Sequence, residues 1–287
     1  MKISGFTLVR NAVKFDYPVV EAITSILPLC DEFIVCLGQS DDDTEKLIQS
    51  IPSDKIKIVP SVWDDSLRQG GRVLAVETNK AFDAIAPDSD WAFYIQADEV
   101  VHEKYLPVIK QAMELYKDHK QVDCLVLKYL HFYGNFKYVA NARNWYRREI
   151  RVIKNDKSIR SYRDAQGFRR DEKKLPGKLI DAFVHHYGWV RSPRFQTAKL
   201  SNFEMLYMPD EKLTIKKDEL YDYSNVSSLV LFSGTHPEVM QARVADMDWD
   251  FEFDITQKRL PLRYRLLDFV ERLTGKRFFE FRNYKLV

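Results

Sequence analysis

The first 120 residues alternate between short apolar segments and amphipathic segments, and this order restricts the fold more than any other feature of the chain. Apolar, strand-like segments occur at residues 3–9, 32–38, 55–61 and 91–96. Segments with apolar residues at helical spacing follow them, at residues 17–27, 42–51, 72–85 and 103–116. Repeated strand–helix alternation favours an α/β fold, with a mostly parallel, Rossmann-like sheet and helices on both faces.

Polar residues follow each of the four expected strands. In open parallel sheets, ligands bind beside the carboxyl ends of the strands. We therefore expect one shared edge to carry Asn11, Ser40 to Asp43, Trp63 to Asp65 and Asp98.

The chain lacks the glycine-rich loops that usually bind nucleotide phosphates. It contains neither GxxxxGK[ST] nor a GxGxxG after the first strand, and has only 10 glycines in all. A nucleotide diphosphate at this edge would need another source of positive charge. A divalent cation held by carboxylates is the natural substitute, because Mg²⁺ and Mn²⁺ prefer oxygen ligands.

In the segment WAFYIQADE, residues 91–99, an apolar, strand-like run is followed by two adjacent acids, Asp98 and Glu99. Neighbouring residues of a strand point to opposite sides, so one acid should face the cleft while the other supports the structure. The alternative is that both acids form the first turn of the next helix, where the helix dipole favours negative charge.

Two adjacent histidines, His185 and His186, lie in the second half of the chain in an apolar segment. They cannot share a face of a strand, so one is a candidate ligand and the other a core residue. A histidine in such a segment is more often structural than a ligand.

The ordered motifs resemble the family 2 glycosyltransferases of the GT-A fold over residues 2–191. The similar segments are the opening strand and acid-rich turn at residues 7–48, the glycine- and asparagine-bearing helix at residues 70–85, and DWAFYIQADEVV at residues 90–101. The resemblance implies a metal-dependent, inverting transfer of sugar from a nucleotide diphosphate sugar, a UDP-sugar, to a glycan or lipid-linked acceptor. It also implies a GT-A domain over residues 1–240, with a nucleotide-sugar half to residue 120 and an acceptor half after it, and a C-terminal helical extension over residues 241–287.

The resemblance also assigns the metal and its ligands. Asp98 matches the last aspartate of the family's D-x-D motif, which binds the Mn²⁺ or Mg²⁺ bridging the donor diphosphate. His186 matches a histidine near that metal, and His185 is the competing choice. Gln96 stands at the first D-x-D position, where a neutral amide is a weaker ligand for a cation.

Further residues are expected around the donor and the acceptor. The donor site is expected to contain Arg10, Asn11, Ser40, Asp42, Arg72, Asn79, Gln96 and Asp98. A backbone hydrogen bond is the alternative role for Asn79, and an ordinary surface position is the alternative for Arg72. The general base is expected to be Asp164, with Glu149 second; both could instead be solvated loop acids.

The overall composition narrows the partners and the compartment. Lys and Arg number 44 against 42 Asp and Glu, a net charge of +2 that argues against nucleic acid as the main partner. Cys30, Cys36 and Cys124 form no paired motif, which indicates a reducing, cytoplasmic location. No segment is apolar enough to span a membrane, so any membrane contact should be peripheral, at the inner membrane face.

The C-terminal segment is basic and apolar, but Asp268, Glu271 and Glu280 interrupt its charge. We therefore expect it to serve packing or homo-oligomerisation rather than membrane contact.

Two other functions compete with sugar transfer. A sugar nucleotidyltransferase shares the α/β layout, but its glycine-rich GxGTR start is absent. A catalytically silent protein that binds a sugar nucleotide or a partner is the other alternative, and Gln96 in place of an acid is the feature that favours it.

Overall fold

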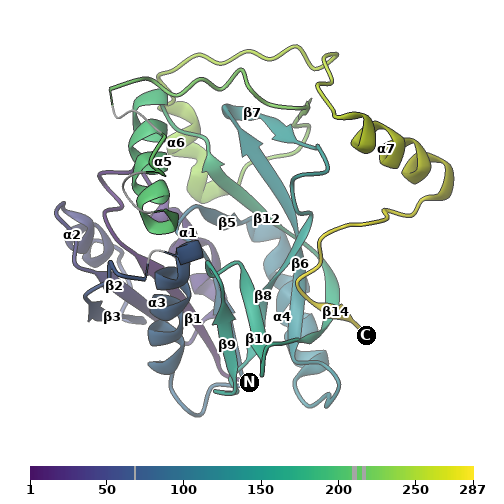
Figure 1. The fold of residues 1–287 in the computed structure, drawn as a ribbon. Coiled ribbons are helices and arrows are strands. Elements are labelled where there is room, and N and C mark those ends of the chain that lie inside the picture. Colours follow the sequence, from purple (N-terminus) through teal and green to yellow (C-terminus); the bar gives the residue numbers. More distant parts are fainter. Residues whose placement is uncertain (68, 209–211, 215–217) are drawn as a thin grey trace.

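The computed structural model describes residues 1–67, 69–208, 212–214 and 218–287, and its centre is a mixed sheet with helices packed on it (Figure 1). The main path through the sheet is β13-β7-β6-β8-β4-β1-β2-β3. Four strands from the first half of the chain form its parallel part: β1 (Ile3–Val9), β2 (Glu32–Gly38), β3 (Ile56–Ser61) and β4 (Trp91–Tyr94). The predicted α/β class is confirmed.

The chain from Glu99 onward continues the same sheet with mixed directions. Its strands are β5 (Glu99–Val101), β6 (Cys124–Tyr133), β7 (Asn135–Ala140), β8 (Arg148–Lys154), β12 (Pro176–Trp189), β13 (Leu229–Leu231) and β14 (Lys285–Leu286). β8 joins the halves, because it pairs antiparallel with both β4 and β6. The long strand β12 runs parallel to β6 and antiparallel to β5. A separate small sheet contains β9 (Ile159–Tyr162), β10 (Gly167–Arg170) and β11 (Lys173–Lys174).

Helices cover both faces of the parallel part, as the alternating pattern predicts. The α-helices are α1 (Val19–Ile26), α2 (Thr44–Gln49), α3 (Arg72–Asp83), α4 (Leu106–Tyr116), α5 (Pro193–Tyr207), α6 (Gln241–Ala245) and α7 (Leu262–Thr274). Short 3-10 turns lie at Leu27–Leu29, Gln69–Gly71, Glu103–Tyr105 and Glu238–Met240. One core contains apolar residues of α1, α2 and α4, and the other contains those of α3. Side chains along β1 point alternately to the two faces of the sheet, so β1 contributes to both of these cores: Val9 to the first and Phe6 to the second.

The structure excludes the alternative that Asp98 and Glu99 form the first turn of a helix. Glu99 begins strand β5 and pairs with His186 of β12, whereas the next helical residues start at Glu103. Asp98 and Glu99 therefore do not form an acidic first turn of a helix.

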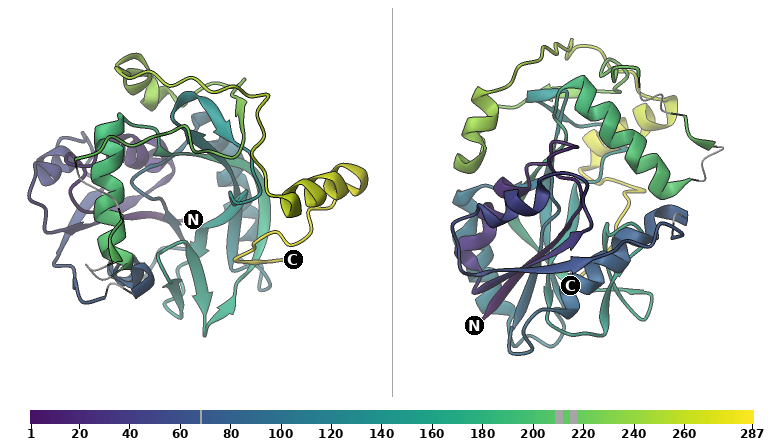
Figure 2. Two further views of the ribbon diagram at one scale, coloured as in Figure 1. Left: turned by 45° about the horizontal axis from the view of Figure 1, so that its top comes forward. Right: turned by 90° about the vertical axis from the view of Figure 1, so that its left-hand side faces the viewer.

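The C-terminal segment, residues 241–287, is only partly helical. After α6 and α7 the chain returns to the sheet, where β14 pairs with the beginning of β12. Figure 2 shows α7 projecting away from the sheet, on the opposite side of the molecule from α5. Within the described ranges, no helix combines the length and the apolar character needed to cross a bilayer.

Candidate active site

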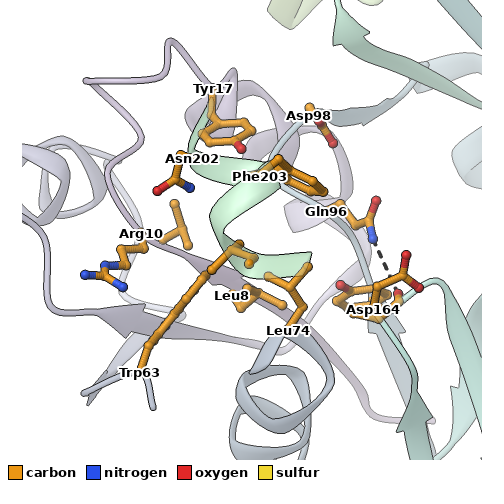
Figure 3. A pocket seen from close by; sticks show the side chains of 15 residues that line it. Leu8, Arg10, Tyr17, Trp63, Leu74, Gln96, Asp98, Asp164, Asn202 and Phe203 are labelled. Atoms are coloured by element: carbon orange, nitrogen blue, oxygen red, sulfur yellow. Dashed lines mark hydrogen bonds between the residues drawn. The ribbon is translucent and has the colours of Figure 1, made fainter. Parts of the chain in front are cut away.

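A cleft lies at the carboxyl ends of β1 and β4, which is the edge that the sequence predicts. It encloses a cavity of about 110 Å³. Figure 3 shows Arg10 and Trp63 at one end and Gln96, Asp98 and Asp164 at the other. Helix α5 closes one side of the cleft with the side chains of Asn202, Phe203 and Leu206.

Hydrogen bonds of the buried Glu99 carboxylate fix the turn that carries Asp98. The Glu99 carboxylate accepts two hydrogen bonds from Arg151, at 2.6 and 2.7 Å, and one from the Tyr129 hydroxyl at 2.8 Å. It also accepts the backbone N–H of Gln96 at 3.1 Å. Glu99 and Arg151 are fully buried. Glu99 is thus a structural residue that fixes the turn, while Asp98 faces the cleft.

Asp98 is paired with a lysine from α5. Lys199 Nζ donates to Asp98 Oδ2 at 2.8 Å and to the Gly188 carbonyl oxygen at 2.8 Å, and both charged side chains are buried. Burial alone would raise the pKa of the Asp98 carboxyl, but the Lys199 ammonium beside it holds that pKa well below its usual range. Burial and the nearby Arg191 lower the pKa of Lys199 to about 8, so the amine is still mostly protonated at neutral pH.

His186 presents an unprotonated ring nitrogen to Asp98. His131 Nε2 lies 2.6 Å from the Tyr146 carbonyl oxygen, which can only accept, so this nitrogen carries the hydrogen. Burial lowers the pKa of His131 to about 3, so its Nδ1 has a lone pair and accepts from His186 Nδ1 at 3.1 Å. Burial likewise lowers the pKa of His186 to about 4. The neutral His186 therefore directs the lone pair of Nε2 toward Asp98 Oδ1, 3.8 Å away.

The close approach of these two groups depends on Gly188. A Cβ atom at this position would lie 2.6 Å from the His186 ring and 2.8 Å from Asp98 Oδ2. No side chain larger than hydrogen fits there without displacing one of them.

The pair Asp98 and His186 fits a divalent cation that is shared with a substrate. A carboxylate oxygen and an imidazole lone pair converge, and the other imidazole nitrogen donates a hydrogen bond, as ligating histidines usually do. In the described ranges, no group of three or more His, Cys, Asp and Glu side chains is arranged to hold a metal. The chain thus offers two ligands here, and substrate oxygens or water would complete the coordination.

The remaining residues predicted for the donor site divide into two groups. Arg10 lines the cleft, stacks over Trp63 with 5.5 Å from its guanidinium carbon to the ring centre, and donates to the Gln39 carbonyl oxygen. Asn11, Ser40 and Asp42 lie in the adjoining loops and do not line the cleft. Their side chains bond within those loops: Asn11 accepts from Asp41 N, Ser40 accepts from Asn11 N, and Asp42 accepts from Lys14 N and Thr44 N.

Four further predicted residues also lie outside the cleft. Arg72 is exposed at the start of α3, and the Asn79 amide oxygen accepts the Ser161 N–H at 2.8 Å. Glu149 is enclosed in β8, where burial raises its pKa to about 7. His185 points to the opposite face of β12 from His186, where its ring packs against Phe132 and Phe232.

Asp164 lines the cleft at the end that also contains Gln96 and Asp98. Its Oδ2 accepts the hydroxyl hydrogen of Tyr207 at 2.8 Å, and its Oδ1 accepts from Gln166 Nε2 at 3.3 Å. Beside it, Gln96 Nε2 donates to the Ala165 carbonyl oxygen at 3.4 Å (Figure 3). The structure thus places Arg10, Gln96, Asp98 and Asp164 of the predicted set along the cleft, with His186 beside Asp98.

Besides the α5 residues that line the cleft, sequence reasoning missed three charged or ionisable residues around Asp98: Lys199, His131 and Arg151. Each acts through a partner that is distant in the chain; Lys199 and Asp98 are 101 residues apart. The sequence signal for His131 is weak, since it lies in an aromatic strand that reads as core. Lys199 lies in a helix without a clear apolar face, whose buried residues include Gln196, Thr197 and Ser201.

Comparisons with known proteins give low similarity. No protein-family model matches the sequence, and no curated protein matches it. Among solved structures, S. aureus TarS is 14% identical with a TM-score of 0.40, over 71% of this chain and 39% of that chain. Glucosyl-3-phosphoglycerate synthase from Mycobacterium tuberculosis, solved with Mn²⁺, UDP and phosphoglyceric acid, is 19% identical with a TM-score of 0.32, over 45% and 43%.

A third structure, 4-diphosphocytidyl-2C-methyl-D-erythritol synthase from Anaerococcus prevotii, is 12% identical with a TM-score of 0.34, over 54% of this chain and 70% of that chain. The chain spans about two fifths of the TarS chain that it matches.

Proposed function

We propose that the protein is a glycosyltransferase similar to family 2, which moves a sugar from a UDP-sugar to a glycan or lipid-linked acceptor with inversion. The observation that carries this proposal is the convergence of Asp98, His186 and Lys199 at the carboxyl edge of a parallel sheet. A carboxylate, an imidazole lone pair and an ammonium group in one buried place suit a bound diphosphate and its cation.

The charge of the leaving group explains why such a cluster is useful. As the bond between the sugar and the diphosphate breaks, negative charge develops on the departing oxygen, and fixed positive groups stabilise it. Lys199 supplies one such charge from the chain itself. Asp98 and His186 would hold Mn²⁺ or Mg²⁺, which acts as a Lewis acid toward the diphosphate oxygens when bound.

The other end of the cleft suits the nucleoside. Trp63 offers an aromatic surface, and its indole N–H has no hydrogen-bond partner among the residues that the structure describes. Arg10 stacks on this ring and adds hydrogen-bond donors. Gln96, between the two ends, can hydrogen-bond a ribose or sugar hydroxyl group.

Asp164 is the proposed general base. It faces the cleft from the second half of the chain, and Tyr207 fixes its orientation. In the transfer, the acceptor oxygen bonds to the anomeric carbon, the bond from that carbon to the diphosphate breaks, and the acceptor proton passes to the Asp164 carboxylate. Glu149 does not line the cleft, so we assign it no step.

A catalytically silent sugar-nucleotide-binding protein is the second candidate. Gln96 favours it, because a neutral amide hydrogen-bonded to the Ala165 carbonyl oxygen replaces an acid beside Asp98.

Donor turnover distinguishes these proposals. We incubate the protein with Mn²⁺ and a panel of nucleotide sugars and measure nucleotide release. We expect release from a UDP-sugar, slowly when water is the acceptor. Asp164→Asn should keep donor binding but lose about 10²-fold or more in release, because the base is removed. Asp181→Asn is the matched control, since Asp181 is exposed and pairs with Lys128 away from the cleft.

Three outcomes separate the candidates. Release that depends on Asp164 supports the transferase. Binding of a UDP-sugar with no release in wild type or variant indicates the silent protein. If no nucleotide sugar binds, both proposals are wrong.

A further inference from the structure

Helix α7 presents an apolar face to solvent. Its residues Leu262, Leu266, Phe269 and Leu273 are 77%, 66%, 60% and 70% exposed. Their spacing of four, three and four residues places them along one side of the helix. A helix of a folded domain usually buries such a stripe. Here the stripe points away from the sheet, and none of the described residues covers it.

The opposite side of α7 is bound to the body of the protein by charge. Asp268 Oδ1 lies 3.4 Å from the Arg143 guanidinium, and Glu271 pairs with Arg143, with Arg147 at 3.6 Å and with Arg277 at 3.7 Å. The acids that interrupt the positive charge in the sequence are therefore neutralised within the chain. These paired acids leave no uncompensated negative charge on this side of the helix.

Arginines border the apolar stripe on both sides. At about 100° of rotation per residue, Arg263 lies on one border, and Arg265 and Arg272 lie on the other. All three are exposed, and among the residues described here none of them has an ion-pair partner. Long cationic side chains at the borders of an apolar stripe can reach anionic groups while the stripe is buried.

An aromatic segment directly after α7 enlarges the apolar surface. Phe278, Phe279 and Phe281 are 46%, 83% and 55% exposed. Lys276 between the helix and this segment is also exposed, and Glu280 is paired with Arg147 at 2.6 Å. The extension thus adds apolar rings and positive charge without adding unpaired acids.

We propose that α7 and residues 278–281 bind the surface of an anionic membrane. The helix lies in the plane of the interface, with the leucine and phenylalanine side chains among the acyl chains and the arginines at lipid phosphate groups. Charge complementarity selects this occupant over a second copy of the chain. Two copies packed through this stripe would bring their unpaired arginine borders together, and like charges oppose such contact.

The test is flotation of the full chain with lipid vesicles. We expect it to float with vesicles of phosphatidylcholine and phosphatidylglycerol, to stay behind with phosphatidylcholine alone, and to be released in about 0.5 M salt, which screens the arginines. Leu266→Glu/Phe269→Glu should lower the bound fraction at least tenfold. Leu115→Glu is the matched control, because Leu115 on α4 is 68% exposed but lies outside α7 and residues 278–281. This variant should bind the vesicles as the wild type does.

A charge variant separates anionic recognition from simple apolar insertion. Arg263→Gln/Arg265→Gln/Arg272→Gln should remove the preference for phosphatidylglycerol. Thermal denaturation verifies that each variant is folded. Equal binding to both vesicle types, or none to either, would overturn the proposal. A wild-type dimer in light scattering that Leu266→Glu/Phe269→Glu converts to monomer would show instead that a second copy covers the stripe.

Discussion

Replacing Lys199 with methionine should lower sugar transfer by about 10²- to 10³-fold, which is the usual cost of removing one fixed group that stabilises transition-state charge. Methionine keeps much of the length of the side chain and removes its charge. The Asp98 carboxylate would then lose the buried ammonium group that donates to it at 2.8 Å. The measurement is kcat with the preferred UDP-sugar in saturating Mn²⁺.

Binding separates a direct role of Lys199 from a structural one. If the Lys199 ammonium contacts the diphosphate, Lys199→Met should lower the affinity for UDP and leave the affinity for uridine unchanged. Lys128→Met removes a lysine from a surface ion pair and should have no effect on either ligand. Equal kcat for Lys199→Met and wild type would contradict the assignment, and equal loss of UDP and uridine would show a general disturbance of the cleft.

Replacing Arg151 with methionine should lower the free energy of unfolding by about 3–5 kcal/mol, since it leaves a buried carboxylate without its counter-charge. Glu99 is fully buried, and Arg151 supplies two of its hydrogen bonds. The turn carrying Asp98 should loosen as well, because Glu99 also accepts the Gln96 N–H. Urea denaturation measures the change.

An exposed ion pair with two hydrogen bonds provides the control. Arg160 contacts both oxygens of Asp83 at 2.6 and 2.8 Å, but both side chains are substantially exposed. Arg160→Met should cost no more than about 1 kcal/mol. Adding Glu99→Gln to Arg151→Met should restore part of the lost stability. Equal losses in the two single variants would show that burial does not determine the strength of the Glu99–Arg151 pair.

The sequence predicts the parallel part of the fold because its signal is local. The alternation of strands and helices appears in consecutive residues, and the rule for carboxyl ends then places Asn11, Trp63 and Asp98 at one edge. The mixed second half carries no comparable rule. Its strand β12 joins β6 through pairs such as Gly177 and Cys124, which no local pattern specifies.

Acid side chains show the limit most clearly. Strand alternation predicts that one of Asp98 and Glu99 supports the structure, but only Arg151, 52 residues later, shows how a buried carboxylate at Glu99 is neutralised. The sequence predicts that Asn11 and Asp42 contact the sugar donor. In the structure, their side chains accept hydrogen bonds from backbone N–H groups of the neighbouring loops instead. Local patterns thus locate the edge of the sheet, while distant partners decide which polar side chains remain available there.

The most direct test of the central claim is calorimetric titration of UDP into the wild-type protein with Mn²⁺ and again with EDTA. The account predicts binding in Mn²⁺ that weakens by about 10²-fold or more in EDTA, since a metal bound to phosphate oxygens contributes several kcal/mol. Asp98→Asn should abolish the difference between the two conditions. The absence of UDP binding to the folded wild-type protein in both conditions would contradict the account.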